Sequence, residues 1–147
     1  EQYIINKYLK KLNFNKSESY NFRNDGAFFK IPQNNKIVVT NDTIIENLDF
    51  FKSDPPKSIA NKIVTCNLSD ISSMGAVPYA YTLSLCLPKK ITNEWLSLFT
   101  KSLFSFQKKF NLDNQPFELR PAIILFNYSS IIEKYCFLIC VIFLCFY

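Results

Sequence analysis

A regular alternation of large and small side chains over residues 79–87 constrains the fold of this chain more than any other feature. The large residues, at every second position, are Tyr79, Tyr81, Leu83, Leu85 and Leu87. A period of two is that of a β-strand, and small side chains on the second face leave room for another layer to cover it. Pro88 ends the pattern, so we predict a strand that other elements of the domain could cover on both of its faces.

Helical periodicity flanks this strand on both sides. Residues 57–74 carry an apolar stripe, and Gly75 stands where a left-handed residue commonly ends a helix. After the strand, Thr92 is a favourable N-cap for a helix that we predict to run to about Phe110.

The N-terminal half adds shorter elements. A short amphipathic helix is predicted over residues 2–12, and strands are predicted over residues 27–31 and 36–45. Asn41 and Asp42 interrupt the second of these strands, which suggests either a bulge or a functional site. Strands and helices in this order predict an α/β (α+β) domain with a mixed β-sheet packed by helices.

Composition excludes several classes of site. The chain has 147 residues, no histidine and a net charge of +5. Without histidine, Ser-His-Asp and Cys-His catalysis and histidine-bound zinc are excluded. None of the five cysteines forms a CxxC pair, and their odd number favours reduced thiols in the cytoplasm. The basic residues are scattered, so we expect no nucleic-acid partner.

The C-terminal segment differs from the rest. Residues 135–147 are apolar throughout, yet shorter than the roughly 20 residues of a membrane-spanning helix, so a membrane role is disfavoured. An out-of-frame or truncated end, a buried segment and a membrane-associated tail remain open. We expect a domain over residues 1–113 and an atypical or disordered tail over residues 114–147 that packs poorly on it.

Three aspartates occupy unusual positions for carboxylates. Asp25 precedes a predicted strand, Asp42 interrupts an apolar strand, and Asp70 lies close to the apolar stripe of a helix. An unpaired buried charge is costly, and a hard cation such as Mg²⁺ would satisfy several carboxylates together. The alternative is that these residues form Asx-turns or salt bridges. The chain has no P-loop pattern.

Several segments in order resemble the motifs of thiamine-monophosphate kinases. Residues 67–78 read NLSDISSMGAVP and resemble the family's NLSDLAAMGAxP. Residues 24–27 resemble its DDAA element, and residues 39–43, VTNDT, resemble its TTDT element. Residues 83–88 and 94–96 resemble its LxLALP segment and its EAWL helix start. The resemblance covers roughly residues 1–113.

This resemblance implies a PurM-like N-terminal domain that pairs its sheet with a second copy. The family transfers the γ-phosphoryl group of ATP to thiamine monophosphate, giving thiamine diphosphate. The motif positions imply Mg²⁺ ligands at Asp25, Thr40, Asn41, Asp42 and Asp70. They also imply a substrate contact at Asp49 and a nucleotide contact at Phe110.

The chain departs from the family pattern at informative positions. Asn41 replaces a threonine, Asp49 replaces a histidine, and Phe110 replaces a tyrosine. The family's GGDT motif should follow Leu112, where this chain has no glycine, and the family's C-terminal domain is absent. We therefore expect a truncated kinase with little or no activity alone. A non-catalytic dimerising remnant or another PurM-like enzyme, such as a hydrogenase-maturation carbamoyl dehydratase, is the alternative.

Overall fold

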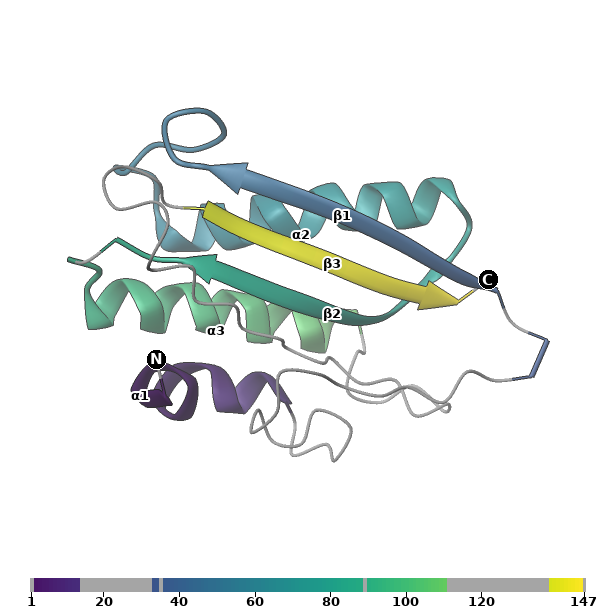
Figure 1. Cartoon of the computed structure of the whole chain (residues 1–147), viewed down its shortest axis with the longest axis horizontal. Coiled ribbons are helices and arrows are strands. Elements are labelled where there is room, and N and C mark those ends of the chain that lie inside the picture. The colour runs from purple at the N-terminus through teal and green to yellow at the C-terminus, as the bar shows by residue number, and fades with distance from the viewer. Residues whose placement is uncertain (1, 14–32, 35, 89, 111–137, 147) are drawn as a thin grey trace.

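A computed structural model describes residues 2–13, 33–34, 36–88, 90–110 and 138–146 (Figure 1). The predicted strand at residues 27–31, the predicted boundary at residue 113 and the side chain of Asp25 lie outside the described residues. In chain order the elements are α1 (Gln2–Ile4), η1 (Ile5–Leu9), η2 (Lys10–Asn13), β1 (Ile37–Ile45), α2 (Pro56–Ser73), β2 (Val77–Cys86), α3 (Asn93–Lys109) and β3 (Leu138–Phe146).

The three described strands form one sheet in the order β1-β3-β2. Both pairings are antiparallel, so β1 and β2 run in the same direction on either side of β3 (Figure 1). The mixture of helices and strands confirms the predicted fold class, although a mixed sheet was expected and both described pairings are antiparallel. The ladder of β1 is continuous through Asn41 and Asp42, so these residues do not form a bulge. A register shift occurs instead in β2, between Pro78 and Ala80.

Within the C-terminal segment that we expected to pack poorly, residues 138–146 form strand β3, and the rest of the predicted tail lies outside the described residues. Residues 138–146 pair along their whole length with both neighbouring strands, for example Phe143 with Thr40 and Tyr81. The physical reason is that β1 and β2 each present an edge of unpaired backbone groups, and an apolar run rich in β-branched and aromatic residues satisfies both edges. The segment is therefore the central strand of the described sheet.

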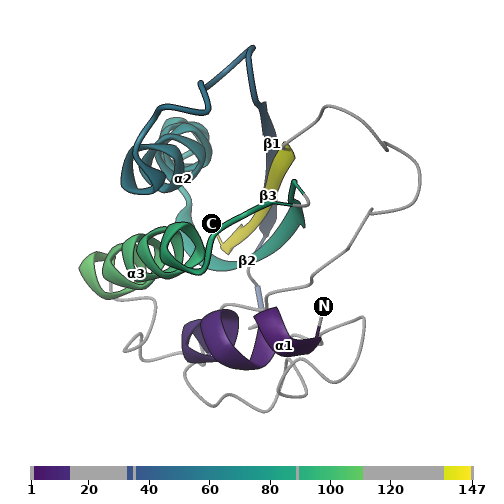
Figure 2. The ribbon, with the colours of Figure 1, turned by 90° about the vertical axis from the view of Figure 1, so that its left-hand side faces the viewer.

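Helices α2 and α3 lie side by side on one face of the sheet (Figure 2). Their buried residues include Ile59, Ile63, Phe99 and Leu103, which pack with Leu83 of β2 in one hydrophobic core. The predicted residues 2–12 form the three short helical segments α1, η1 and η2, which bury Leu9 and Leu12 against the same core. No helix in the described part of the chain is long and apolar enough to cross a membrane.

The helix ends agree with the sequence signals. Gly75 has a φ of 65°, and the N–H of Ala76 reaches the carbonyl of Ile71 over 3.1 Å, which is the bond of a Schellman motif. The Thr92 side chain accepts a hydrogen bond of 3.1 Å from the backbone N–H of Trp95 and caps α3. These two local signals fix where α2 ends and α3 begins.

Candidate functional site

Strand β1 carries the predicted metal ligands on alternate faces. Thr40 and Asp42 are half-buried on the side that meets α2, whereas Asn41 is exposed. Because successive side chains of a strand point to opposite faces, Asn41 points away from its two neighbours. The structure thus brings Thr40 and Asp42 to one face and does not bring the Asn41 side chain to them.

The Asp42 carboxyl group has an unusual electrostatic environment. Its Oδ2 atom is buried and has no hydrogen-bond partner among the described residues. Burial of the carboxyl group and, second, the nearby charge of Asp70 raise the pKa of Asp42 above its ordinary value. The fold therefore holds a carboxylate with one buried oxygen atom, Oδ2, to which no group in the described part of the chain donates a hydrogen bond.

A divalent cation fits this arrangement. Asp70 lies on the exposed side of α2 and acts electrostatically on Asp42, so the two predicted carboxylates share one region. A hard cation prefers oxygen ligands and would satisfy the unpartnered Oδ2 atom while removing the repulsion. Among the described residues no group of three or more acidic, cysteine or histidine side chains could hold a metal. Asp25, the third predicted carboxylate, is outside those residues.

Asn67, which the motif positions do not predict as a ligand, also lies in this region. Its side chain has no solvent exposure, accepts a hydrogen bond of 3.0 Å from the Thr40 hydroxyl and donates one of 3.0 Å to the carbonyl of Ile63. The available signal was an amide within the apolar stripe of a helix, four residues after Ile63. Asn67 positions the Thr40 oxygen beside Asp42 by joining β1 to α2.

Asp49 closes the turn that follows β1. Its Oδ2 atom accepts a hydrogen bond of 2.9 Å from the backbone N–H of Ile45, and its carbonyl accepts one from the Lys62 ammonium group. Asn47, in the same turn, has a φ of 68°, a conformation that asparagine tolerates better than most residues. The structure thus gives the predicted substrate contact a local structural role.

Phe110 lies at the end of α3, away from the turn. Its ring stacks with that of Phe106 at 6.1 Å between centroids, and the Lys109 ammonium lies 5.5 Å from its centroid. The ring is half-buried and packs against the core. Its predicted contact with a nucleotide stays a prediction.

Comparison with known families assigns the fold that carries this site. Residues 23–114 match the family model described as AIR synthase related protein, N-terminal domain. The chain belongs to this family. Strand β3 lies beyond the residues matched, yet it takes the central place in the sheet of this AIR synthase related domain.

Relatives of this AIR synthase related domain include thiamine-monophosphate kinases. That of Buchnera aphidicola subsp. Schizaphis graminum is 39% identical over 111 residues, which is 75% of this chain and 34% of the relative. The chain thus spans about a third of the length of the curated relative.

Solved structures show the same fold. A structure of AaThiL complexed with AMPPCP and TMP has a TM-score of 0.63 at 20% identity, and covers 83% of this chain and 35% of that one. The hydrogenase maturation protein HypE in complex with ATP has a TM-score of 0.66 at 14% identity, and covers 98% of this chain and 39% of that one. At these identities the likeness concerns the fold alone.

Proposed function

We propose that this chain is the nucleotide- and Mg²⁺-binding domain of a thiamine-monophosphate kinase, which transfers the γ-phosphoryl group of ATP to thiamine monophosphate. The observation that carries the proposal is the electrostatic interaction between Asp42 and Asp70. It occurs in a chain that is 39% identical to a thiamine-monophosphate kinase. A related fold has been solved with AMPPCP and TMP, which supports ATP and thiamine monophosphate as the ligands.

The proposed mechanism assigns distinct tasks to the residues of β1 and α2. Asp42 and Asp70 would hold Mg²⁺ from two elements, with the Thr40 oxygen beside them and Asp25 as a further predicted ligand. Bound Mg²⁺ neutralises phosphate charge, which is the main requirement of phosphoryl transfer. The hydrogen bond from Thr40 to Asn67 fixes the spacing of β1 and α2, so the carboxylates are positioned before a nucleotide arrives.

The described sheet also supports the proposed homodimer. On the face of β1 turned away from α2, Ile37 and Val39 are 47% and 56% exposed, and Val77 at the start of β2 is 50% exposed. Exposed apolar side chains on a sheet favour association with a second sheet. We propose that a second copy covers them and that the protein acts in the cytoplasm.

We expect this chain to bind nucleotide but to phosphorylate thiamine monophosphate only weakly. The segment after Leu112 lacks the glycine-containing motif that would supply a further metal-binding aspartate. Loss of one electrostatic contact of this kind costs roughly a hundredfold or more in rate. The expected result is Mg²⁺-dependent nucleotide binding with thiamine-monophosphate phosphorylation far below that of a full-length kinase.

Calorimetric titration of the purified chain with ATP tests the proposal, in the presence and absence of Mg²⁺. We expect the binding of ATP to require Mg²⁺. Asp42→Asn and Asp70→Asn should each weaken this binding by about tenfold or more, because each removes a charged metal ligand. Glu94→Gln, an exposed carboxylate in the first turn of α3, is the matched control and should bind as the native chain does. Binding that is indifferent to Mg²⁺ and to both substitutions would contradict the proposal. A chain that dimerises without binding ATP would instead be a non-catalytic remnant.

A further inference from the structure

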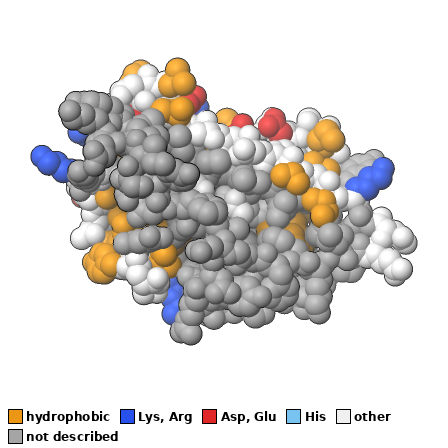
Figure 3. Space-filling model, viewed as in Figure 1, with side chains coloured by type: hydrophobic (Ala, Val, Ile, Leu, Met, Phe, Trp, Pro, Cys, Tyr) orange, Lys and Arg blue, Asp and Glu red, His pale blue; other side chains and the backbone are white. Residues whose placement is uncertain are grey.

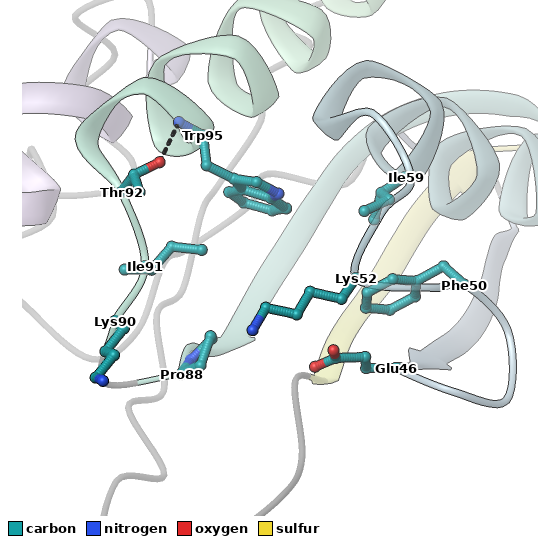
Figure 4. A pocket seen from close by; sticks show the side chains of 9 residues that line it. All are labelled: Glu46, Phe50, Lys52, Ile59, Pro88, Lys90, Ile91, Thr92 and Trp95. Carbon is teal, nitrogen blue, oxygen red and sulfur yellow. Dashed lines mark hydrogen bonds between the residues drawn. The ribbon is translucent and has the colours of Figure 1, made fainter.

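A separate pocket of about 200 Å³ lies between the turn that follows β1, the first turn of α2 and the connection from β2 to α3 (Figure 4). Its described lining residues are Glu46, Phe50, Lys52, Ile59, Pro88, Lys90, Ile91, Thr92 and Trp95. None of the predicted metal ligands that the structure describes contributes to it. The pocket therefore belongs to neither the Asp42–Asp70 region nor the exposed sheet face.

The inner wall of this pocket is apolar and aromatic. Phe50 and Ile59 are 3% and 2% exposed, so their side chains are held by the core. Trp95 is half-buried, and its ring stacks on that of Phe99 with centroids 4.9 Å apart and an interplanar angle of 17°. A stacked indole keeps its position, so this wall offers a rigid surface for a planar ring.

Charged groups lie around the apolar wall. Lys52, Lys90 and Glu46 make no ion pair with one another or with other described residues. Figure 4 shows Lys52 extending toward Pro88 with its ammonium group in the pocket, whereas the Lys90 ammonium points outward. The Lys52 ammonium group, which has no ion-pair partner among the described residues, is therefore the cation that an acidic ligand in the pocket would meet.

We infer that this pocket binds a small aromatic anion, a single ring that carries a carboxylate or a phosphate. The ring would lie against Trp95 and Phe50, and the acidic group would pair with the Lys52 ammonium. Pockets for drug-sized ligands usually exceed about 300 Å³, so a volume of about 200 Å³ restricts the ligand to one ring. The inference does not depend on the proposed kinase activity.

Trp95 gives the experiment its readout because it is the single tryptophan of the chain. Tryptophan emission would be followed during titration with benzoate and with phenyl phosphate, which distinguish a carboxylate from a phosphate. Benzyl alcohol and benzylamine are the neutral and cationic counterparts. We expect saturable changes with one or both anions, and weaker binding of the neutral and cationic compounds.

Variants of Lys52 test the assigned contact. Lys52→Ala should weaken anion binding by about tenfold, the loss expected when a charge-assisted hydrogen bond is removed, whereas Lys52→Arg should retain it. Lys57→Ala removes an exposed lysine of α2 that does not line the pocket and should bind as the native chain does. Lys52 is exposed, so thermal melts of the native chain and Lys52→Ala should coincide. Absence of saturable binding, equal binding of benzylamine, or an unchanged affinity in Lys52→Ala would each overturn the inference.

Discussion

The hydroxyl of Thr40 donates a hydrogen bond of 3.0 Å to the side-chain oxygen of Asn67, which joins the helix-facing side of β1 to α2. The bond crosses between two elements that approach each other beside Asp42, and Asn67 is itself held by the carbonyl of Ile63. The polar contact thus lies on the same face of β1 as Asp42, one of the predicted metal ligands. On the helix side the contact is flanked by buried apolar residues, Ile63, Val64 and Leu68.

Removal of this hydrogen bond should destabilise the domain. Thr40→Val keeps the shape and strand propensity of the side chain but leaves the Asn67 oxygen without its donor. An unsatisfied buried polar atom costs about 1–3 kcal/mol, which should appear as a lower free energy of unfolding in urea. Thr43→Val on the exposed face of β1 is the matched control and should change this quantity by less than about 0.5 kcal/mol. Equal effects of the two substitutions would show that the bond contributes nothing.

Neutralisation of Asp42 should stabilise the metal-free domain at neutral pH. The folded state raises the pKa of Asp42 above its unfolded value of about 3.9, so the fold disfavours the ionised form. The contribution of Asp42 to stability is therefore greatest below that unfolded value and is lost as pH rises through the raised pKa.

Thermal melts of the native chain and Asp42→Asn across pH test this sign. The variant should melt higher at pH 7, and the difference should disappear below about pH 4, where the native carboxyl group is protonated. Glu94→Gln should show no such pH-dependent gain. A native chain that is more stable than Asp42→Asn at pH 7 without metal would reverse the interpretation.

Strand β3 should be required for folding. Ile142 pairs with Asn41 on one side and with Thr82 on the other, so proline at this position removes a donor from the middle of the sheet. We expect Ile142→Pro to lose cooperative unfolding, measured by circular dichroism, because proline in the middle of a sheet removes a ladder hydrogen bond and is found essentially only on edge strands. Ile142→Val keeps the donor and the β-branched character, and should fold. A soluble, cooperatively folded Ile142→Pro variant would show that β1 and β2 do not depend on the central strand.

Substitution of Asp49 separates a structural role from a substrate role. Asp49→Ala removes the acceptor for the Ile45 N–H group and should lower the free energy of unfolding by about 1 kcal/mol, whereas Asp49→Asn retains an acceptor and should lower it less. Binding of thiamine monophosphate, measured by calorimetry, gives the second readout. If Asp49 acts through the turn, Asp49→Asn leaves any such binding unchanged. A change in ligand affinity at unaltered stability would place Asp49 in the substrate site.

Local signals explain the elements that the sequence predicted well. The helix predicted from Thr92 to about Phe110 is Asn93–Lys109, and that predicted over residues 57–74 is Pro56–Ser73. Capping residues and apolar periods operate within a few residues, so a single sequence displays them. The charge of Asp70 acts on Asp42, and the use of both carboxylates as metal ligands stays a prediction.

The features that were missed depend on contacts distant in sequence. Residues 138–146 have no polar period, so their composition did not distinguish a central strand from a membrane tail or an out-of-frame end. Their place follows from pairing with β1, about a hundred residues earlier in the chain. Likewise the motif placed Asn41 with Asp42, and only the pleat of a regular strand shows that the two side chains lie on opposite faces.

The sequence by itself determined the helices, the alternating strand β2 and the family, because each depends on residue type and short spacing. Only the tertiary structure decided that β3 lies between β1 and β2, that Asn67 holds Thr40, that Asp49 closes a turn and that Trp95 lines a pocket with Lys52. These are relationships between segments that the chain separates by many residues, and they arise when backbone edges and apolar faces are satisfied together.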